Sequence, residues 1–155
     1  MVKIIKAEEK YIPDICKLWW EFIWFHADIE PFFTPKDDAR AGFENEFLRK
    51  QMKSEKSLVH VALDGEKVIG YAISELQNIP GSKIERCGYI NHLHVAKEYR
   101  RRGIGEKMYR EILKWFRTNG IGVVELQLTA KNEAACAFWR KMGYKDLQHT
   151  WYREI

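Results

Sequence analysis

The feature that most constrains the fold is an uncharged strand that leads through a glycine-rich loop into an amphipathic helix. No Asp, Glu, Lys or Arg occurs from Cys87 to Ala96, which predicts a strand buried on both faces near the centre of a sheet. From Gly103 to Thr118 the apolar residues recur with a helical period, and Asn119-Gly120 ends the pattern. The segment is therefore expected to form a strand followed directly by a helix.

The rest of the chain supplies further strands and helices around this unit. Asp64-Gly65 separates two strand-like runs and favours a tight hairpin turn. In chain order the other expected elements are a strand over 2–6, helices over 11–26 and after Pro35, strands over 58–63 and 67–76, a strand over 122–128, a helix over 132–142 and one or two closing strands over 144–155. The order β-α-α-β-β-β-α-β-α-β predicts an α/β (α+β) fold, with helices on both faces of a mixed sheet, as a single domain over residues 1–155.

Composition excludes several classes of protein. The longest stretch without a charged residue spans ten residues, against roughly 18 for a membrane span, and the charged first ten residues do not fit a signal peptide. Three cysteines without CxxC spacing predict neither a disulfide framework nor a metal site. We therefore expect a cytoplasmic protein that uses no metal and binds no membrane. The net charge of +4 suits an anionic small molecule as well as nucleic acid, and no nucleic-acid recognition motif accompanies it.

The loop itself has the composition of a phosphate site. In Arg100-Arg101-Arg102-Gly103-Ile104-Gly105 the glycines let backbone N–H groups and a helix start approach a pyrophosphate, and the arginines add charge-assisted hydrogen bonds. The alternative is a simple turn with a solvated basic face. A Rossmann fingerprint would need a glycine at Met108, and no P-loop motif occurs in the chain.

Two motifs and a hairpin resemble the GNAT superfamily of acyl-CoA N-acyltransferases. Residues 93–105 resemble its strand-loop-helix motif, which ends in (Arg/Gln)-x-x-Gly-x-(Gly/Ala), and residues 132–144 resemble its Asn-x-x-Ala-x-x-x-(Tyr)-x-x-x-Gly-Phe helix. Residues 64–71 are similar to the strands that precede these motifs. The resemblance implies a mixed, mostly antiparallel central sheet flanked by helices.

The resemblance also implies an activity, which is transfer of an acetyl group from acetyl-CoA to a primary amine of a small molecule or a protein. The amine would attack the thioester directly in a ternary complex. The backbone of the strand that ends near Val95 would bind the pantetheine arm. The arginine loop and the start of the following helix would bind the pyrophosphate. The helix predicted over 132–142 would also contact the coenzyme. The coenzyme residues implied are Leu93, His94, Val95, Arg100, Arg101, Arg102, Gly103, Ile104, Gly105, Glu106, Asn132 and Ala135.

The catalytic positions of the family fall on Tyr89 and Asn91, and the carboxylate of many members is missing there. An amide cannot act as a base, so we expect water relayed by Asn91 and Tyr89 to take the amine proton. Side-chain alternation along a strand predicts that His92 and His94 face away from these two residues unless a bulge intervenes. Both histidines are then expected to have packed, hydrogen-bonded core roles.

Two further positions concern the acid and the acceptor. Trp139 occupies the position of the usual tyrosine acid, so the coenzyme would leave as a thiolate or take its proton from another group such as Tyr89. Aromatic residues of the first helix and the loop after it either line the acceptor cleft, cap the core or form a homodimer contact. The substrate-binding candidates are Trp20, Trp24, Phe25 and His26, together with Phe32 and Phe33.

Because the usual acid and base are absent, a non-catalytic acyl-CoA sensor of the same fold is the alternative to the enzyme. A basic nucleic-acid-binding domain is the least favoured reading, because it depends only on the three arginines and the net charge.

Overall fold

The computed structural model describes all residues from 1 to 155 and contains one five-stranded sheet. Its strands lie in the order β1-β2-β3-β4-β5, so each strand neighbours the next one in the chain. All neighbours are antiparallel except β4 and β5, which are parallel because a helical crossover connects them. The strand bounds are Val2–Lys6 (β1), Ser57–Asp64 (β2), Lys67–Asn78 (β3), Arg86–Val95 (β4) and Val124–Leu126 (β5).

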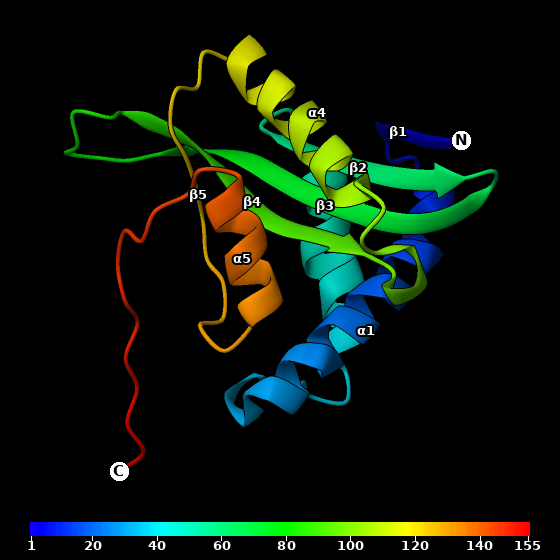
Figure 1. Ribbon diagram of the computed structural model, residues 1–155, viewed down its shortest axis with the longest axis horizontal. Coiled ribbons are helices and arrows are strands. Elements are labelled where there is room, and N and C mark those ends of the chain that lie inside the picture. The colour runs from blue at the N-terminus through cyan, green and yellow to red at the C-terminus, as the bar shows by residue number, and fades with distance from the viewer.

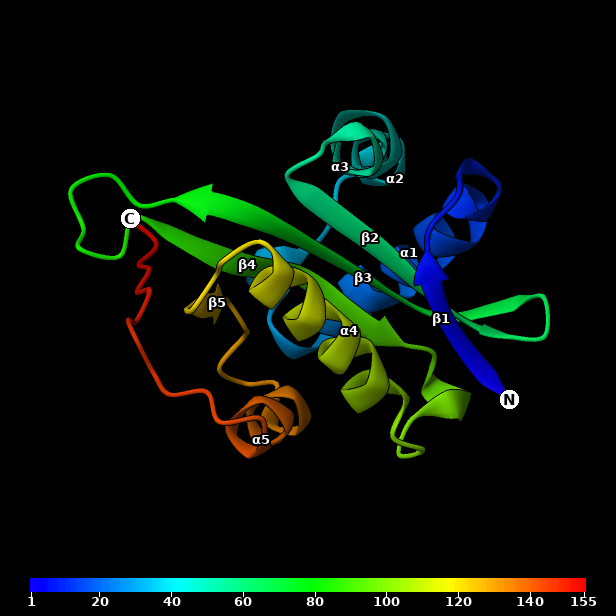
Figure 2. The same ribbon diagram turned by 90° about the horizontal axis from the view of Figure 1, so that it is seen from above.

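Helices cover both faces of this sheet (Figure 1). One face carries α1 and the helical run α2-η3-α3, and the opposite face carries α4 and α5, as the view from above shows (Figure 2). Within the run, η3 is a π-helical segment. The helix bounds are Ile12–Ile29 (α1), Ala39–Gly42 (α2), Phe43–Leu48 (η3), Arg49–Lys53 (α3), Ile104–Thr118 (α4) and Glu133–Lys141 (α5), with short 3₁₀ turns at Glu9–Tyr11 (η1), Pro31–Phe33 (η2) and Lys97–Tyr99 (η4).

The sheet separates two apolar cores, because β2 and β3 carry apolar side chains on both faces. Val61 and Tyr71 lie in the core beneath α1, whereas the adjacent Ala62 and Ala72 lie in the core beneath α4 and α5. Close packing of α4 on β4 depends on a glycine there. A Cβ atom at Gly88 would lie 2.6 Å from the Phe116 ring, so a larger residue would push α4 away from β4.

Most of the predicted architecture is confirmed. The sheet is mixed and mostly antiparallel, helices flank both faces, and the hairpin forms with Gly65 at a φ of +61°. The strand predicted over 87–96 is β4, but it is the fourth of five strands, and of its last five residues only His94 is buried. The prediction of a central strand buried on both faces therefore holds only for its first half.

The predicted closing strand over residues 144–155 is wrong. The chain after α5 has no helix or strand, and from Lys145 to Ile155 every residue is exposed. Figure 1 shows this segment running away from the sheet. The strand predicted over 122–128 shortens to the three residues of β5, which has no second neighbour to extend it. No helix in the structure is both long enough and apolar enough to cross a membrane.

Candidate active site

The central feature of the site is an open edge of β4. Residues 88–90 pair with residues 124–126 of β5, and from residue 91 to residue 95 no strand lies beside β4 on this side. The N–H and C=O groups of an unpaired strand edge can bind an extended ligand as an additional strand. Leu93, His94 and Val95, for which the sequence predicts contact with the pantetheine arm, all lie in this open stretch.

A β-bulge interrupts β4 at Asn91. On the β3 side, Ile73 lies opposite His92 and Ser74 lies opposite Ile90, which leaves Asn91 without a partner residue. A bulge of this kind shifts the alternation of side chains by one residue. The amide nitrogen Nδ2 of Asn91 is buried and has no hydrogen-bond partner within the protein.

The bulge places Tyr89 and His92 on the same face of the sheet, toward α1. Tyr89 lies opposite Glu75, whose carboxylate accepts a hydrogen bond from a glutamine of α3 at 3.1 Å. The His92 ring lies 5.5 Å from the ring of Phe22 in α1, measured between centroids. The bulge that the sequence analysis named as the exception is therefore present, and His92 and His94 do not face away from Tyr89.

Two carboxylates flank Tyr89 from the neighbouring strands. Glu75 of β3 and Glu125 of β5 both lie opposite Tyr89 in the register of the sheet. Burial raises the pKa of the Tyr89 phenol, and the negative charges of Glu125 and Glu75 raise it further, so the phenol is protonated at neutral pH. The Glu75 oxygens bind glutamine amides at 3.1 and 2.7 Å, whereas Glu125 makes no ion pair.

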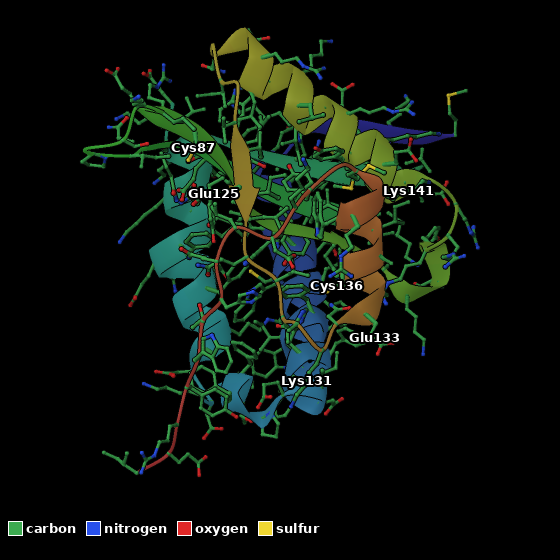
Figure 3. The ribbon with its side chains drawn as sticks, turned by 60° about the vertical axis from the view of Figure 1, so that its left-hand side comes forward. Cys87, Glu125, Lys131, Glu133, Cys136 and Lys141 are labelled. Carbon is green, nitrogen blue, oxygen red and sulfur yellow. The ribbon has the colours of Figure 1, made fainter.

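Glu125 is the residue that sequence reasoning missed, because that reasoning sought a base only on β4. Its place beside Tyr89 comes from the pairing of β4 with β5, and Figure 3 shows it on that short strand. One signal was available, since Glu125 is the single charged residue between Gly122 and Leu128. A lone carboxylate in an otherwise uncharged strand is an uncommon choice unless it has a role.

Both histidines of β4 are neutral at neutral pH. Burial lowers the pKa of His92 to about 4, with a further contribution from His26, and lowers that of His94 to about 3, with a further contribution from Arg100. The His92 Nδ1 atom lies 3.3 Å from the Tyr71 hydroxyl. His92 is thus packed and hydrogen-bonded, whereas the Nε2 atom of the buried His94 has no partner.

The loop between β4 and α4 turns through two left-handed backbone positions. Gly103 has a φ of +73° and Arg101 a φ of +64°, which is unusual for a residue with a side chain. Gly103 directly precedes α4, so the unbonded N–H groups of the first helical turn and the positive end of the helix dipole lie at this loop. This geometry suits an anion.

The three arginines of the loop differ in their contacts. The Nε atom of Arg100 donates to the backbone oxygen of Val95 at 2.9 Å, and its guanidinium lies 5.8 Å from the centre of the Phe25 ring. Arg102 donates to a carbonyl oxygen of η4 at 2.9 Å. Arg101 is exposed and makes no hydrogen bond or ion pair with another side chain. Its guanidinium is therefore free to bind a phosphate.

Gly105 faces the space between β4 and α5. A Cβ atom there would lie 3.7 Å from the side chains of Leu93 and Phe138, which is an ordinary contact distance. A single methyl group fits, but a branched side chain would occupy the space that separates the two elements. The absence of a side chain at Gly105 thus leaves room beside the open edge of β4.

The two neighbours of Gly105 hold α4 in place. Ile104 is buried in the core beneath α4 and α5. Glu106 forms ion pairs with Arg110 at 2.6 Å and with Lys141 of α5 at 3.6 Å, and these cations lower the pKa of its carboxyl group. Its side chain therefore connects the two helices, and only its backbone faces the loop end of α4.

A second group of contacts joins the start of α5 to the end of α1. The Asn132 Oδ1 atom accepts a hydrogen bond from the backbone N–H of Ala135 at 3.1 Å and thereby caps α5. Its Nδ2 atom lies 3.3 Å from Nε2 of His26, and Lys131 forms an ion pair with Glu30 at 2.6 Å. Figure 3 shows Lys131 in the loop that leads into α5.

The structure brings together only part of the predicted acceptor residues. Phe25 lies beside Arg100, and His26 lies beside Asn132, so both border the candidate coenzyme site. Trp20 packs partly on the core beneath α1 and contacts Trp24, with ring centres 6.0 Å apart. The ring contacts of these two tryptophans stay within α1.

Trp139 does not face the open edge of β4. Its buried ring packs against Tyr109 of α4 and against Tyr144, with ring centres 5.5 and 5.2 Å apart. Its role is to fill the core beneath α4 and α5. The family position at which many members carry a tyrosine acid is therefore occupied here by a core residue, Trp139.

Comparison with known proteins agrees with this geometry. The sequence model of the Acetyltransferase (GNAT) family matches residues 16–144, which include the open edge of β4, the arginine loop and α5. The chain belongs to the GNAT acetyltransferase family. The predicted resemblance is confirmed.

Individual proteins and solved structures resemble the chain over most of its length. N-alpha-acetyltransferase 30 of Schizosaccharomyces pombe is 26% identical over 144 residues, which are 93% of this chain and 84% of that protein. A mutant of the BH1408 protein from Bacillus halodurans has a TM-score of 0.86 and 21% identity, and the alignment spans 99% of both chains. A predicted acetyltransferase from Clostridium acetobutylicum, solved with acetyl-CoA, has a TM-score of 0.81 and 17% identity over 99% of this chain and 96% of that one.

Proposed function

We propose that this GNAT chain transfers an acetyl group from acetyl-CoA to a primary amine of a small molecule or a protein, by direct attack in a ternary complex. The observation that supports this most is the open edge of β4, which leads into an arginine- and glycine-rich helix start. An extended arm with a phosphate at one end suits such a surface.

The residues around this surface fit acetyl-CoA. The backbone of Leu93, His94 and Val95 would pair with the pantetheine arm, in the space that Gly105 leaves beside it. The pyrophosphate would lie at the start of α4, in contact with the backbone of the loop and with the Arg101 guanidinium. The full set of proposed coenzyme residues is Leu93, His94, Val95, Arg100 through Glu106, Asn132 and Ala135.

The proton of the attacking amine needs an acceptor, because a primary ammonium has no free electron pair. Glu125 is the carboxylate beside Tyr89 that makes no ion pair, and both residues face α1. We propose that Glu125 accepts this proton. The proton would reach Glu125 through Tyr89 or through a water molecule held by the unpartnered Asn91 amide. The amine nitrogen then bonds to the thioester carbon and the carbon–sulfur bond breaks, while the second proton of the nitrogen passes through Tyr89 or solvent to the leaving thiolate.

The acceptor would approach from the α1 side of β4, since Glu125, Tyr89 and His92 all face that way. Phe25 and His26 border this approach, and Trp20 and Trp24 lie farther along the same helix. The non-catalytic acyl-CoA sensor is the competing proposal, supported by the burial of Trp139. A free carboxylate beside a protonated phenol favours the enzyme.

Release of coenzyme A from acetyl-CoA, measured against polyamines, amino acids, aminoglycosides and peptides with free N-termini, tests the proposal. At least one amine class should give saturable release and an acetylated product identified by mass. Tight binding of acetyl-CoA without release for any amine class would favour the sensor, and absence of binding would reject both.

A further inference from the structure

A row of side chains crosses the α1 face of the sheet at the level of Tyr89. Glu75 of β3 lies on one side of Tyr89 and Glu125 of β5 lies on the other. Neighbouring strands lie about 4.8 Å apart, so the backbones of the two glutamates are roughly 10 Å apart. The charges of both raise the pKa of the Tyr89 phenol, which shows that both carboxylates act on the same place. The proposed mechanism uses Glu125 and leaves Glu75 without a function.

Glu75 is held in place by neutral groups. Its Oε2 atom accepts a hydrogen bond from Gln51 of α3 at 3.1 Å, and its Oε1 atom accepts one from Gln77 at 2.7 Å. Amide N–H groups orient a carboxylate but, unlike Lys or Arg, they bring no positive charge to it. The Oε1 atom of Gln51 is buried without a hydrogen-bond partner, so this amide is directed at Glu75 at the expense of its own oxygen.

No cation of the protein balances the two glutamates. None of the ion pairs in the structure includes either of them, and Arg49 of α3 pairs with Glu44 at 2.7 Å. His92 and His94 on the same face are neutral, because burial lowers their pKa values to about 4 and about 3. Two carboxylates without a counter-charge on one face of the site favour a ligand that carries positive charge.

We infer that the amine acceptor is a short aliphatic diamine, which reacts at one nitrogen while Glu75 binds the second nitrogen as an ammonium group. The inference rests on the proposed acetyltransferase function and adds the chemical class of the acceptor. The first nitrogen gives its proton to Glu125 and is acetylated, and the second keeps its charge throughout the reaction. An ammonium group supplies the positive charge that the two glutamines do not. An acceptor with a single charge would leave Glu75 unbalanced.

Putrescine and butylamine are the matched acceptors for a test, because they share a carbon chain and differ by one ammonium group. At neutral pH, kcat/KM should be about 10-fold higher for putrescine, as expected for one hydrogen bond between charged groups. Glu75→Gln should remove this preference by raising KM for putrescine, without a change in the turnover of butylamine. Glu85→Gln is the matched control, because the same change of charge in the exposed end of the loop between β3 and β4 should leave the preference intact.

Gln51→Lys tests the same charge while Glu75 remains. A lysine at this position would bring an ammonium group of the protein to Glu75, so the preference for putrescine should fall and butylamine turnover should persist. Calorimetry with bound coenzyme A, which has no acetyl group to transfer, measures binding without reaction. Putrescine should bind about 10-fold more tightly than butylamine to the wild type and equally tightly in Glu75→Gln.

Equal kcat/KM for the two amines, or equal affinities in the wild type, would overturn the inference. A similar loss for both amines in Glu75→Gln would also overturn it, because Glu75 would then act on the reacting nitrogen. Absence of acetyl transfer to any amine would instead reject the proposed function. The calorimetric comparison would still decide whether Glu75 binds a second ammonium group.

Discussion

The two faces of β4 present different chemistry. Toward α4 and α5 it presents the apolar Leu93 side chain and the space beside Gly105, next to its open backbone edge. Toward α1 it presents Tyr89, flanked by two carboxylates, and the neutral His92. One face therefore suits a ligand bound by main-chain groups, and the other suits proton transfer. The bulge at Asn91 separates them, because it changes which residues point to each face.

This difference predicts that the two parts of the candidate site respond differently to substitution. The binding surface along the open edge of β4 should be lost when a new side chain fills the space beside Gly105. A proton acceptor is lost when its charge is removed, although the fold and the coenzyme affinity remain. Three effects on binding and turnover, from the largest to the smallest, and one effect on stability separate the two faces.

The largest effect is expected from Gly105→Val, which would fill the space between Leu93 and Phe138. Coenzyme A affinity, measured by calorimetry, should fall by about 100-fold, which corresponds to about 2.7 kcal/mol and lies in the upper part of the roughly 1–3 kcal/mol that overpacking costs. Gly122→Val is the matched control, because a Cβ there meets no atom within 4 Å. Unchanged affinity in a folded Gly105→Val protein would show that the coenzyme does not pass beside Gly105.

Glu125→Gln should lower kcat/KM by about 100-fold at neutral pH, as expected for loss of a general base, and leave coenzyme affinity unchanged. The pH profile of the variant should rise toward the pKa of the amine itself. Glu75→Gln should cost less, because two glutamines already hold that carboxylate. Equal kcat/KM in wild type and Glu125→Gln would show that solvent, and not Glu125, accepts the proton of the attacking amine.

Arg101→Ala should weaken binding of coenzyme A by about 10-fold, the usual loss for one hydrogen bond to a charged group. Binding of pantetheine, which lacks phosphates, should not change. Arg117→Ala, an exposed arginine in the last turn of α4, serves as the control for net charge. A similar loss for pantetheine would mean that Arg101 acts through the conformation of the loop.

The last prediction concerns stability on the α1 face. The pKa of His92 is about 4 and that of His94 about 3, both below the ordinary value of 6.5, so the unfolded chain binds protons first as the pH falls. The contribution of these two histidines to the free energy of unfolding should therefore be complete above pH 6.5. Below it, stability should fall by about 1.4 kcal/mol per pH unit for each histidine, until the folded-state pKa is reached. Urea unfolding between pH 7 and 5 should show a shallower slope for His92→Gln, and an identical slope would contradict the burial of a neutral imidazole.

The conformation of the candidate coenzyme loop could largely be predicted from sequence, because it depends on neighbours in the chain. Arg100 to Gly105 form a loop at the end of a strand whatever the rest of the fold does. The glycines, the arginines and the helix start were therefore recognisable together. The place of Glu125 beside Tyr89 could not be predicted in this way, since Tyr89 is 36 positions earlier and reaches it only through the pairing of β4 with β5.

The sequence by itself determined the periodic elements, the hairpin turn and the family, because hydrophobic period, turn residues and glycine spacing are local properties. Only the tertiary structure decided the face on which His92 lies, the burial of Trp139 in a core and the unpaired state of residues 144–155. Each of these depends on a partner distant in sequence: Ile73 opposite the bulge, Tyr109 beside the indole, and a free strand edge. Side-chain direction and strand pairing are set by packing between elements, and a local pattern carries no information about which element becomes the neighbour.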